Sequence, residues 1–265
     1  MHPQIESGTE LLGRLNKKPS LCGLEDTLFF KGPRCTDIIE ISGVQSSGKT
    51  LLLSQMLAKC ILPNYHEIKG CNASAVLINT DHHFQTSKLE ELMSNIVNNA
   101  VDTVSFTTDS IDLKFDKIAV VKNSLRNLHV INCYDSEQFA VTLRTLNNIF
   151  IENTKVALLA IDSITAYYWQ DRKDNHVTVN AYVKNLLQLI KTHTAQFNVA
   201  TIYTKLYKSI DNKGKKLTDN INYRIHLYKT YNSKNFTCTL ETTQIVRKIH
   251  YSILSNGIRW KMDEK

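Results

Sequence analysis

The sequence predicts an α/β fold: a mostly parallel sheet flanked by helices, with antiparallel strands at its C-terminal end. Between residues 37 and 203, short apolar segments alternate with helical ones. These strands are apolar throughout, which is typical of parallel strands covered on both faces. After Tyr207 the pattern changes to period-two segments, and Asn256-Gly257 is a typical hairpin turn.

The elements follow from these patterns in order. A short capped helix is expected at 7–15, loops at 17–31, and irregular structure at 100–116, where Thr, Ser and Asp are dense. The expected buried strands are 37–41, 75–79, 129–133, 156–162 and 199–203. The expected helices are 50–60, 87–98, 136–150 and 177–197. The period-two strands are 223–231, 236–240, 246–254 and 258–260.

A phosphate-binding loop lies between the first strand and the first long helix. Residues 43–50 fit G-x-x-x-x-G-K-[ST], and the strand–loop–helix order is the context that this motif needs. Glycines let backbone N–H groups converge on an anion at a helix N-terminus. Lys49 would contact the β- and γ-phosphates of ATP, and Thr50 would reach Mg²⁺. The expected nucleotide-binding residues are Gly43, Val44, Gln45, Ser46, Ser47, Gly48, Lys49 and Thr50.

Two aspartates follow predicted strands. Asp162 ends an apolar strand, which is the usual source of the acid that orders Mg²⁺, so we expect it to act with Thr50, through water. Asp81 follows the 75–79 strand and is the candidate for positioning an attacking water. Each could instead simply cap the helix that follows its strand.

Charge and cysteine usage narrow the function class. The net charge is +7, and residues 205–248 hold ten Lys and Arg against three Asp and Glu. A localised basic surface indicates a polyanion such as nucleic acid, although edge-strand lysines that block aggregation would give the same count. The six cysteines form no C-x-x-C pair, which argues against zinc and dithiol sites. No apolar run is long enough to span a bilayer, so no membrane association is expected.

Several segments carry a family resemblance. Residues 6–15, the phosphate loop, 58–63, 76–84 and 158–169 occur in order and together resemble the eukaryotic RecA-type recombinase paralogues. The resemblance covers about residues 5–205 and implies a RecA-type P-loop ATPase core that uses ATP and Mg²⁺. It also implies nuclear work in homologous-recombination repair of double-strand breaks, on single-stranded or branched DNA, within a hetero-oligomer of paralogues.

The resemblance also bears on organisation. We expect one RecA-like core over 1–265, with a short helix and loop at 1–36 and a basic loop plus strand extension at 205–265. About 35 residues precede the first core strand, so no separate N-terminal DNA-binding domain is expected. The family's upstream Phe-x-x-Ala polymerisation motif is absent. Its sole match, residues 197–200, lies at a helix–strand junction and should pack in the core, which implies an end subunit of the assembly.

Two loops of this family face DNA and correspond here to 167–180 and 205–222. The first mixes aromatic rings with cations, a combination suited to single strands. Tyr168 and Trp169 could equally pack on the core. The DNA-contact candidates are Tyr168, Trp169, Arg172, Lys173, Lys205, Lys208, Lys213, Lys215 and Lys216.

Two positions depart from an active recombinase. Asp81 stands where the family has a catalytic glutamate, and Lys205 stands where it has a γ-phosphate-sensing glutamine. A side chain shorter by one methylene can cost about 100-fold in rate. We therefore expect ATP binding with slow or partner-dependent hydrolysis. An independent DNA-dependent ATPase and a nucleotide-free interaction subunit remain alternatives.

Overall fold

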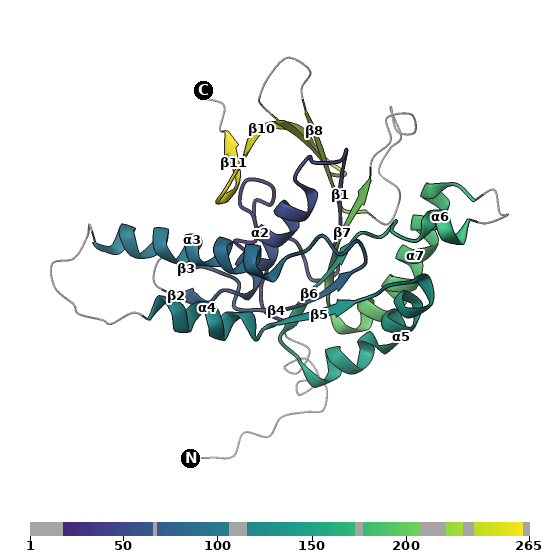
Figure 1. Cartoon of the computed structure of the whole chain (residues 1–265), viewed down its shortest axis with the longest axis horizontal. Coiled ribbons are helices and arrows are strands. Elements are labelled where there is room, and N and C mark those ends of the chain that lie inside the picture. Colours follow the sequence, from purple (N-terminus) through teal and green to yellow (C-terminus); the bar gives the residue numbers. More distant parts are fainter. Residues whose placement is uncertain are drawn as a thin grey trace.

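The computed structural model describes residues 18–65, 68–105, 116–172, 177–206, 221–229 and 236–261. Within them the main sheet has nine strands in the order β11-β10-β9-β8-β1-β7-β6-β4-β5 (Figure 1). The strands from β8 to β5 run parallel, and the pairs from β8 to β11 are antiparallel. This architecture confirms the predicted fold class.

The bounds of the elements are as follows. The parallel strands are β1 Ile38–Gly43, β4 Ser74–Asn79, β5 Leu128–Asn132, β6 Val156–Asp162 and β7 Ala200–Leu206. The later strands are β8 Tyr223–Lys229, β9 Phe236–Glu241, β10 Val246–Leu254 and β11 Gly257–Lys261. A small hairpin joins β2 Asn64–Tyr65 to β3 Ile68–Lys69. The helices are α2 Lys49–Ile61, α3 Thr86–Ser105, α4 Lys117–Leu125, α5 Ser136–Glu152, α6 Tyr168–Asp171 and α7 Val179–Thr194, followed by a 3₁₀ turn at Ala195–Phe197.

Most predicted elements are confirmed, one prediction is wrong in part, and the short helix α6 and the β2–β3 hairpin are additions that were not predicted. The irregular structure predicted from residue 100 is wrong as far as Ser105, because α3 continues through that segment. Helix α4 was not predicted. It begins at the Asp116 cap, whose carboxylate accepts from the backbone N–H groups of Ile118 and Ala119 at 3.0 Å each. The helix predicted at 7–15 lies outside the described residues.

Two apolar layers enclose the parallel part of the sheet. Helices α2, α3 and α4 cover one face, together with Leu24 and Phe29 from the segment before β1. Helices α5 and α7 cover the other face, where Phe139 and Leu187 pack on β6 and β7. Within the Phe-x-x-Ala match, Phe197 contacts Phe150 at a ring distance of 5.5 Å and Ala200 is buried in β7, so this motif packs in the core, as predicted.

The C-terminal strands lie against the phosphate loop and the first helix. Tyr251 on β10 donates a hydrogen bond to the carbonyl of Ser47 at 2.8 Å. The backbone N–H of Ile258 on β11 donates to Gln55 of α2 at 2.9 Å. The antiparallel extension therefore helps to fix the position of the loop before α2.

Candidate nucleotide-binding site

The phosphate loop occupies the turn between β1 and α2. Gly48 has φ = 89° and Ser46 has φ = 59°, both in the left-handed region. A side chain at Gly48 would be strained, and a Cβ at Gly43 would lie 2.5 Å from the carbonyl oxygen of Leu227. The two glycines thus serve different needs: one supplies the backbone conformation and the other a close approach of strands.

The N-terminus of α2 is left open for an anion. Its cap residue, Gly48, forms no side-chain cap, and its first turn contains no acidic residue. The first N–H groups of a helix have no intrahelical acceptor, so this end favours negative charge. Lys49 adds an ammonium group, which donates to the Val44 carbonyl at 2.9 Å. Burial lowers the pKa of Lys49, while Asp162 and Asp81 partly offset that effect.

Asp162 lies at the end of β6 beneath the loop. Its Oδ1 accepts a hydrogen bond from Thr204, whereas its Oδ2 is buried and has no partner among the described residues. The Ser47 hydroxyl is likewise buried without a partner there. Buried polar atoms are usually satisfied, so these two orphaned groups fit a ligand. Thr50 and the open Asp162 oxygen suit a hydrated Mg²⁺ beside a phosphate, because Mg²⁺ prefers oxygen ligands and keeps several waters.

Asp81 follows β4, and its backbone N–H donates to the Asp162 carbonyl at 3.0 Å. The residue reaches solvent at the cavity mouth, yet the surrounding walls raise the pKa of its carboxyl. Asp162 raises this pKa further, and His83 and Lys49 partly oppose the shift. The neighbouring His82 has φ = 55° and stacks on Tyr134 at a ring distance of 4.6 Å. The loop that carries Asp81 is therefore held from its outer side.

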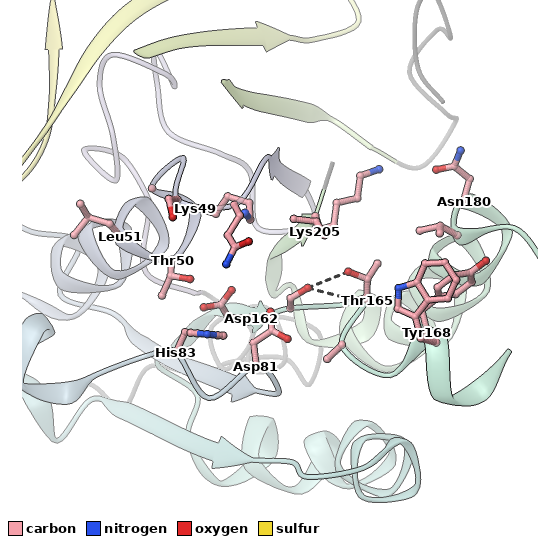
Figure 2. A pocket seen from close by; sticks show the side chains of 18 residues that line it. Lys49, Thr50, Leu51, Asp81, His83, Asp162, Thr165, Tyr168, Asn180 and Lys205 are labelled. Carbon is pink, nitrogen blue, oxygen red and sulfur yellow. Dashed lines mark hydrogen bonds between the residues drawn. The ribbon is translucent and has the colours of Figure 1, made fainter. Parts of the chain in front are cut away.

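These groups border one open cavity of about 550 Å³. Figure 2 shows Lys49 and Thr50 on one side, Asp81 and Asp162 at the centre, and Tyr168 and Asn180 on the opposite side. The predicted site residues that line the cavity are Gln45, Ser46, Gly48, Lys49, Thr50, Asp81, Asp162, Tyr168, Trp169 and Lys205. Gly43 and Ser47 are buried in the loop, and Val44 is exposed beside it.

Lys205 does not lie on the solvent-exposed surface, where a DNA contact would require it. It is buried, and its ammonium lies 2.8 Å from Oε2 of Glu40, which is 1% exposed. Glu40 also accepts from the Tyr203 hydroxyl at 2.7 Å and from Nε of Arg224 at 3.0 Å. The charge of Lys205 is therefore held inside the protein. Sequence reasoning missed Glu40, although a carboxylate in the middle of an apolar strand was a visible signal.

The two candidate aromatic residues of α6 have different surroundings. Tyr168 is 4% exposed and donates to the Val177 carbonyl at 2.8 Å, so its ring packs inside, as the alternative reading allowed. Trp169 is 58% exposed, and the Arg172 guanidinium lies 5.4 Å from its ring centroid. Only Trp169 presents a ring to solvent. The remaining candidates, Lys173, Lys208, Lys213, Lys215 and Lys216, lie outside the described residues, so their DNA contacts stay predictions.

The chain is similar in sequence to several known proteins. No protein-family model matches the chain. The chain is 31% identical over 171 residues to the DNA repair protein XRCC2 of Mus musculus, a match covering 64% of the chain and 55% of that protein. The chain is a relative of the RecA-type recombinase paralogues. This confirms the resemblance that the sequence motifs indicated.

Two further relatives agree with this assignment. The DNA repair protein XRCC2 homolog of Arabidopsis thaliana is 25% identical over 178 residues, with 59% of the chain and 48% of that protein covered. The DNA repair and recombination protein RadA of Methanocorpusculum labreanum is 25% identical over 172 residues, with 62% and 48% covered. The likeness to RadA supports a RecA-like core. The chain spans about half the length of the curated relatives it matches.

Proposed function

We propose that this chain is an ATP-binding recombinase-paralogue subunit for homologous-recombination repair of DNA double-strand breaks in the nucleus. It would bind DNA within a complex of paralogues and help a recombinase to assemble on DNA. The observation that carries the proposal is a buried Asp162 oxygen that has no partner in the described part of the chain, in a cavity that Lys49 and Thr50 also line. Support for the biological role comes from the relatives, which are named as DNA repair and recombination proteins.

The residues of the site have separate tasks in this proposal. The first-turn N–H groups of α2 and the Lys49 ammonium would bind the phosphates. The Thr50 hydroxyl and the Asp162 carboxylate would orient the waters and oxygens around Mg²⁺. When bound, Mg-ATP supplies negative charge and a metal centre that compensate the buried polar groups of the cavity. The chain itself would bind and orient the nucleotide, and Asp81, one methylene shorter than glutamate, would activate water slowly.

The proposed partner is another recombinase paralogue. The chain's own Phe-x-x-Ala match packs against the core through partly buried Phe197 and buried Ala200, which would keep it from plugging into a neighbour. Strand β5 is an edge strand of the sheet: it pairs with β4 on one side and ends the described strand order. Edge strands present unpaired backbone groups that a partner strand can use. This asymmetry favours an end subunit that receives a partner segment and donates none.

Co-purification with candidate paralogues, with nucleotide measured on the isolated complex, tests the whole proposal. The expected result is a stable hetero-oligomer that carries ATP or ADP on this chain and binds single-stranded or branched DNA. A complex that is stable and active in repair without any nucleotide on this chain would contradict it. That outcome would favour the interaction-subunit alternative.

An independent DNA-dependent ATPase is the second candidate, because Asp81 borders the cavity and the pKa of its carboxyl is raised, as suits a general base. The two candidates predict different effects of side-chain length. If the short side chain of Asp81 limits hydrolysis, Asp81→Glu should raise DNA-stimulated ATP turnover by up to about 100-fold. Asp81→Asn should abolish the turnover that wild type retains. A wild-type enzyme that already turns over rapidly, with no gain from glutamate, would favour the independent ATPase.

The pH dependence of that turnover supplies a further test of Asp81. A general base acts in its ionised form, and the pKa of Asp81 is raised above the ordinary aspartate value of 3.8 by burial and by Asp162. Turnover should therefore fall, as pH decreases, at a higher pH than an ordinary aspartate would give. Initial rates across the acid range, with the Asp81→Asn variant as baseline, would show this limb. An acid limb that the Asn variant retains would exclude Asp81 as the base.

A further inference from the structure

The four C-terminal strands have one buried face and one outer face. Ile225, Cys238, Ile249 and Ile258 point into the core beside α2 and α3. Because side chains alternate along a strand, their neighbours in sequence point the opposite way. The surface that these neighbours form is called the outer face here. Its residues are Arg224, His226 and Tyr228 on β8, Thr237, Thr239 and Glu241 on β9, Val246, Lys248, His250, Ser252 and Leu254 on β10, and Arg259 and Lys261 on β11.

Strand register aligns these residues in rows across the sheet. One row runs Lys205–Ser42–His226–Thr239–Lys248, from the strand that borders the nucleotide cavity to β10. A second row runs Tyr228–Thr237–His250–Lys261. Hydrogen bonds of 3.2 Å join Ser42 to His226 and Thr237 to His250 within the rows. The outer face is therefore a mostly polar surface, with exposed Val246 and Leu254 at the two ends of β10. It is about 14 Å wide from β8 to β11 at the usual strand spacing.

Helices α5 and α7 cover the same side of the sheet as the outer face, but among the described residues they do not extend over β8–β11. The apolar cluster beneath α5 and α7 draws on β1, β4, β6 and β7, and contains no residue from 223–261 among those described. Lys248, His250, Arg259 and Lys261 are exposed accordingly. Thr237 on β9 is buried, but no described helix covers the exposed polar groups of β10 and β11. These groups are available to a ligand in a way that the helix-covered part of the same sheet is not.

The outer face carries a net positive charge. Glu241 is the only acidic residue in the four strands as described, and Arg224 bonds its carboxylate at 3.2 Å. The cations beyond that pair are Lys248, Arg259 and Lys261, on the two outermost strands. Such a stripe complements the regular negative charge of a phosphate backbone.

Two aromatic rings lie on the same face, across β9 from this basic stripe. His226 and Tyr228 stack at a ring distance of 5.4 Å with 26° between their planes, and both are half-buried on β8. Burial lowers the pKa of His226, which favours the neutral imidazole as a stacking surface. Rings that can stack on bases, on one face with cations that can neutralise phosphates, form the combination that binds single strands without sequence preference.

We infer that the outer face of β8–β11 binds single-stranded DNA, with phosphates on Lys248, Arg259 and Lys261 and a base against Tyr228. The inference rests on the proposed function, because it assumes that the chain binds DNA at all. It locates that binding on a folded sheet surface rather than on the loops 167–180 and 205–222. A strand bound there would run from the outer edge of the sheet toward Lys205 and the nucleotide cavity.

The test compares two triple variants of the full chain that remove the same charge. The first is Lys248→Gln, Arg259→Gln and Lys261→Gln, and the control is Lys122→Gln, Lys184→Gln and Lys191→Gln on exposed positions of α4 and α7. Binding of fluorescent oligothymidylate is measured from 50 to 300 mM salt. The outer-face variant should bind at least about tenfold more weakly at 0.1 M salt. Its log–log salt slope should be shallower by about two, since each lost contact removes about 0.7.

A Tyr228→Leu variant separates base stacking from charge. It should weaken oligothymidylate binding roughly tenfold, leave the salt slope unchanged, and have no effect on binding of inorganic polyphosphate. Equal binding by the two triple variants would overturn the inference while leaving DNA binding elsewhere on the chain intact. A wild-type chain that binds no oligonucleotide would instead remove the DNA-binding part of the proposed function. Loss of paralogue co-purification in the outer-face variant, with DNA binding unchanged, would identify the face as a protein contact and overturn the inference.

Discussion

Replacing Lys49 with alanine is expected to weaken Mg-ATP binding by about 100-fold. The ammonium belongs to the first residue of α2, and a charge-assisted hydrogen bond to phosphate contributes about 1.5–3 kcal/mol. Among the described residues Lys49 donates to the Val44 carbonyl of its own loop, at 2.9 Å, and it borders the cavity with Asp162. Removing it leaves the loop conformation to Gly43 and Gly48, so the protein should still fold.

Thermal unfolding with and without Mg-ATP measures the effect. A ligand that binds only the folded state raises the unfolding temperature, and the shift grows with the logarithm of the ligand concentration relative to its dissociation constant. Wild type and Lys184→Ala, an exposed control on α7, should be stabilised equally by millimolar Mg-ATP. Lys49→Ala should show little stabilisation at the same concentration. An undiminished shift in Lys49→Ala would mean that nucleotide binds away from the phosphate loop.

Replacing Glu40 with glutamine is expected to lower the free energy of unfolding by about 3 kcal/mol. Its carboxylate is 1% exposed and accepts from Lys205, Arg224 and Tyr203 on three neighbouring positions of β7 and β8. Glutamine keeps the volume but leaves the buried Lys205 ammonium without its counter-charge and leaves Arg224 with only the partly exposed Glu241. Removing one partner of a buried ion pair typically costs 3–5 kcal/mol.

Urea unfolding of Glu40→Gln beside Glu241→Gln measures this difference. Glu241 also bonds Arg224, at 3.2 Å, but its side chain is 33% exposed, so its loss should cost at most about 1 kcal/mol. Similar losses of unfolding free energy in the two variants would show that Glu40 is not the centre of this ion-pair network. If Lys205 becomes exposed in Glu40→Gln, its amino group should also react faster with a lysine-labelling reagent than in wild type.

The phosphate loop and the parallel strands could be predicted from the sequence because their signals are local. Residues 43–50 carry both glycines and the Lys–Thr pair in one stretch, and strands such as 156–162 are apolar in every position before Asp162. Helix α4 was missed because its apolar residues, Ile118 among them, are partly exposed and give no clear stripe. The end of α3 was missed because a polar composition was taken as irregular structure.

The electrostatic arrangement could not be predicted, because it depends on strand register. Nothing local in the sequence shows that Lys205 lies opposite Ser42 or that Glu40 lies between Tyr203 and Arg224. The same limit applies to Tyr168, whose burial depends on contacts with Val177 and Tyr182 across the loop. The pairing of β8 with β1 in parallel was also unexpected, since its period-two pattern suggested only the antiparallel extension.

Titration calorimetry of the purified full chain with ATP, in the presence and absence of Mg²⁺, tests whether the phosphate loop and Asp162 bind Mg-ATP. We expect one ATP bound per chain, with affinity that rises on adding Mg²⁺ and with no such gain in Asp162→Asn. A correctly folded wild-type chain that binds no ATP at millimolar concentration in the presence of Mg²⁺ would contradict this expectation.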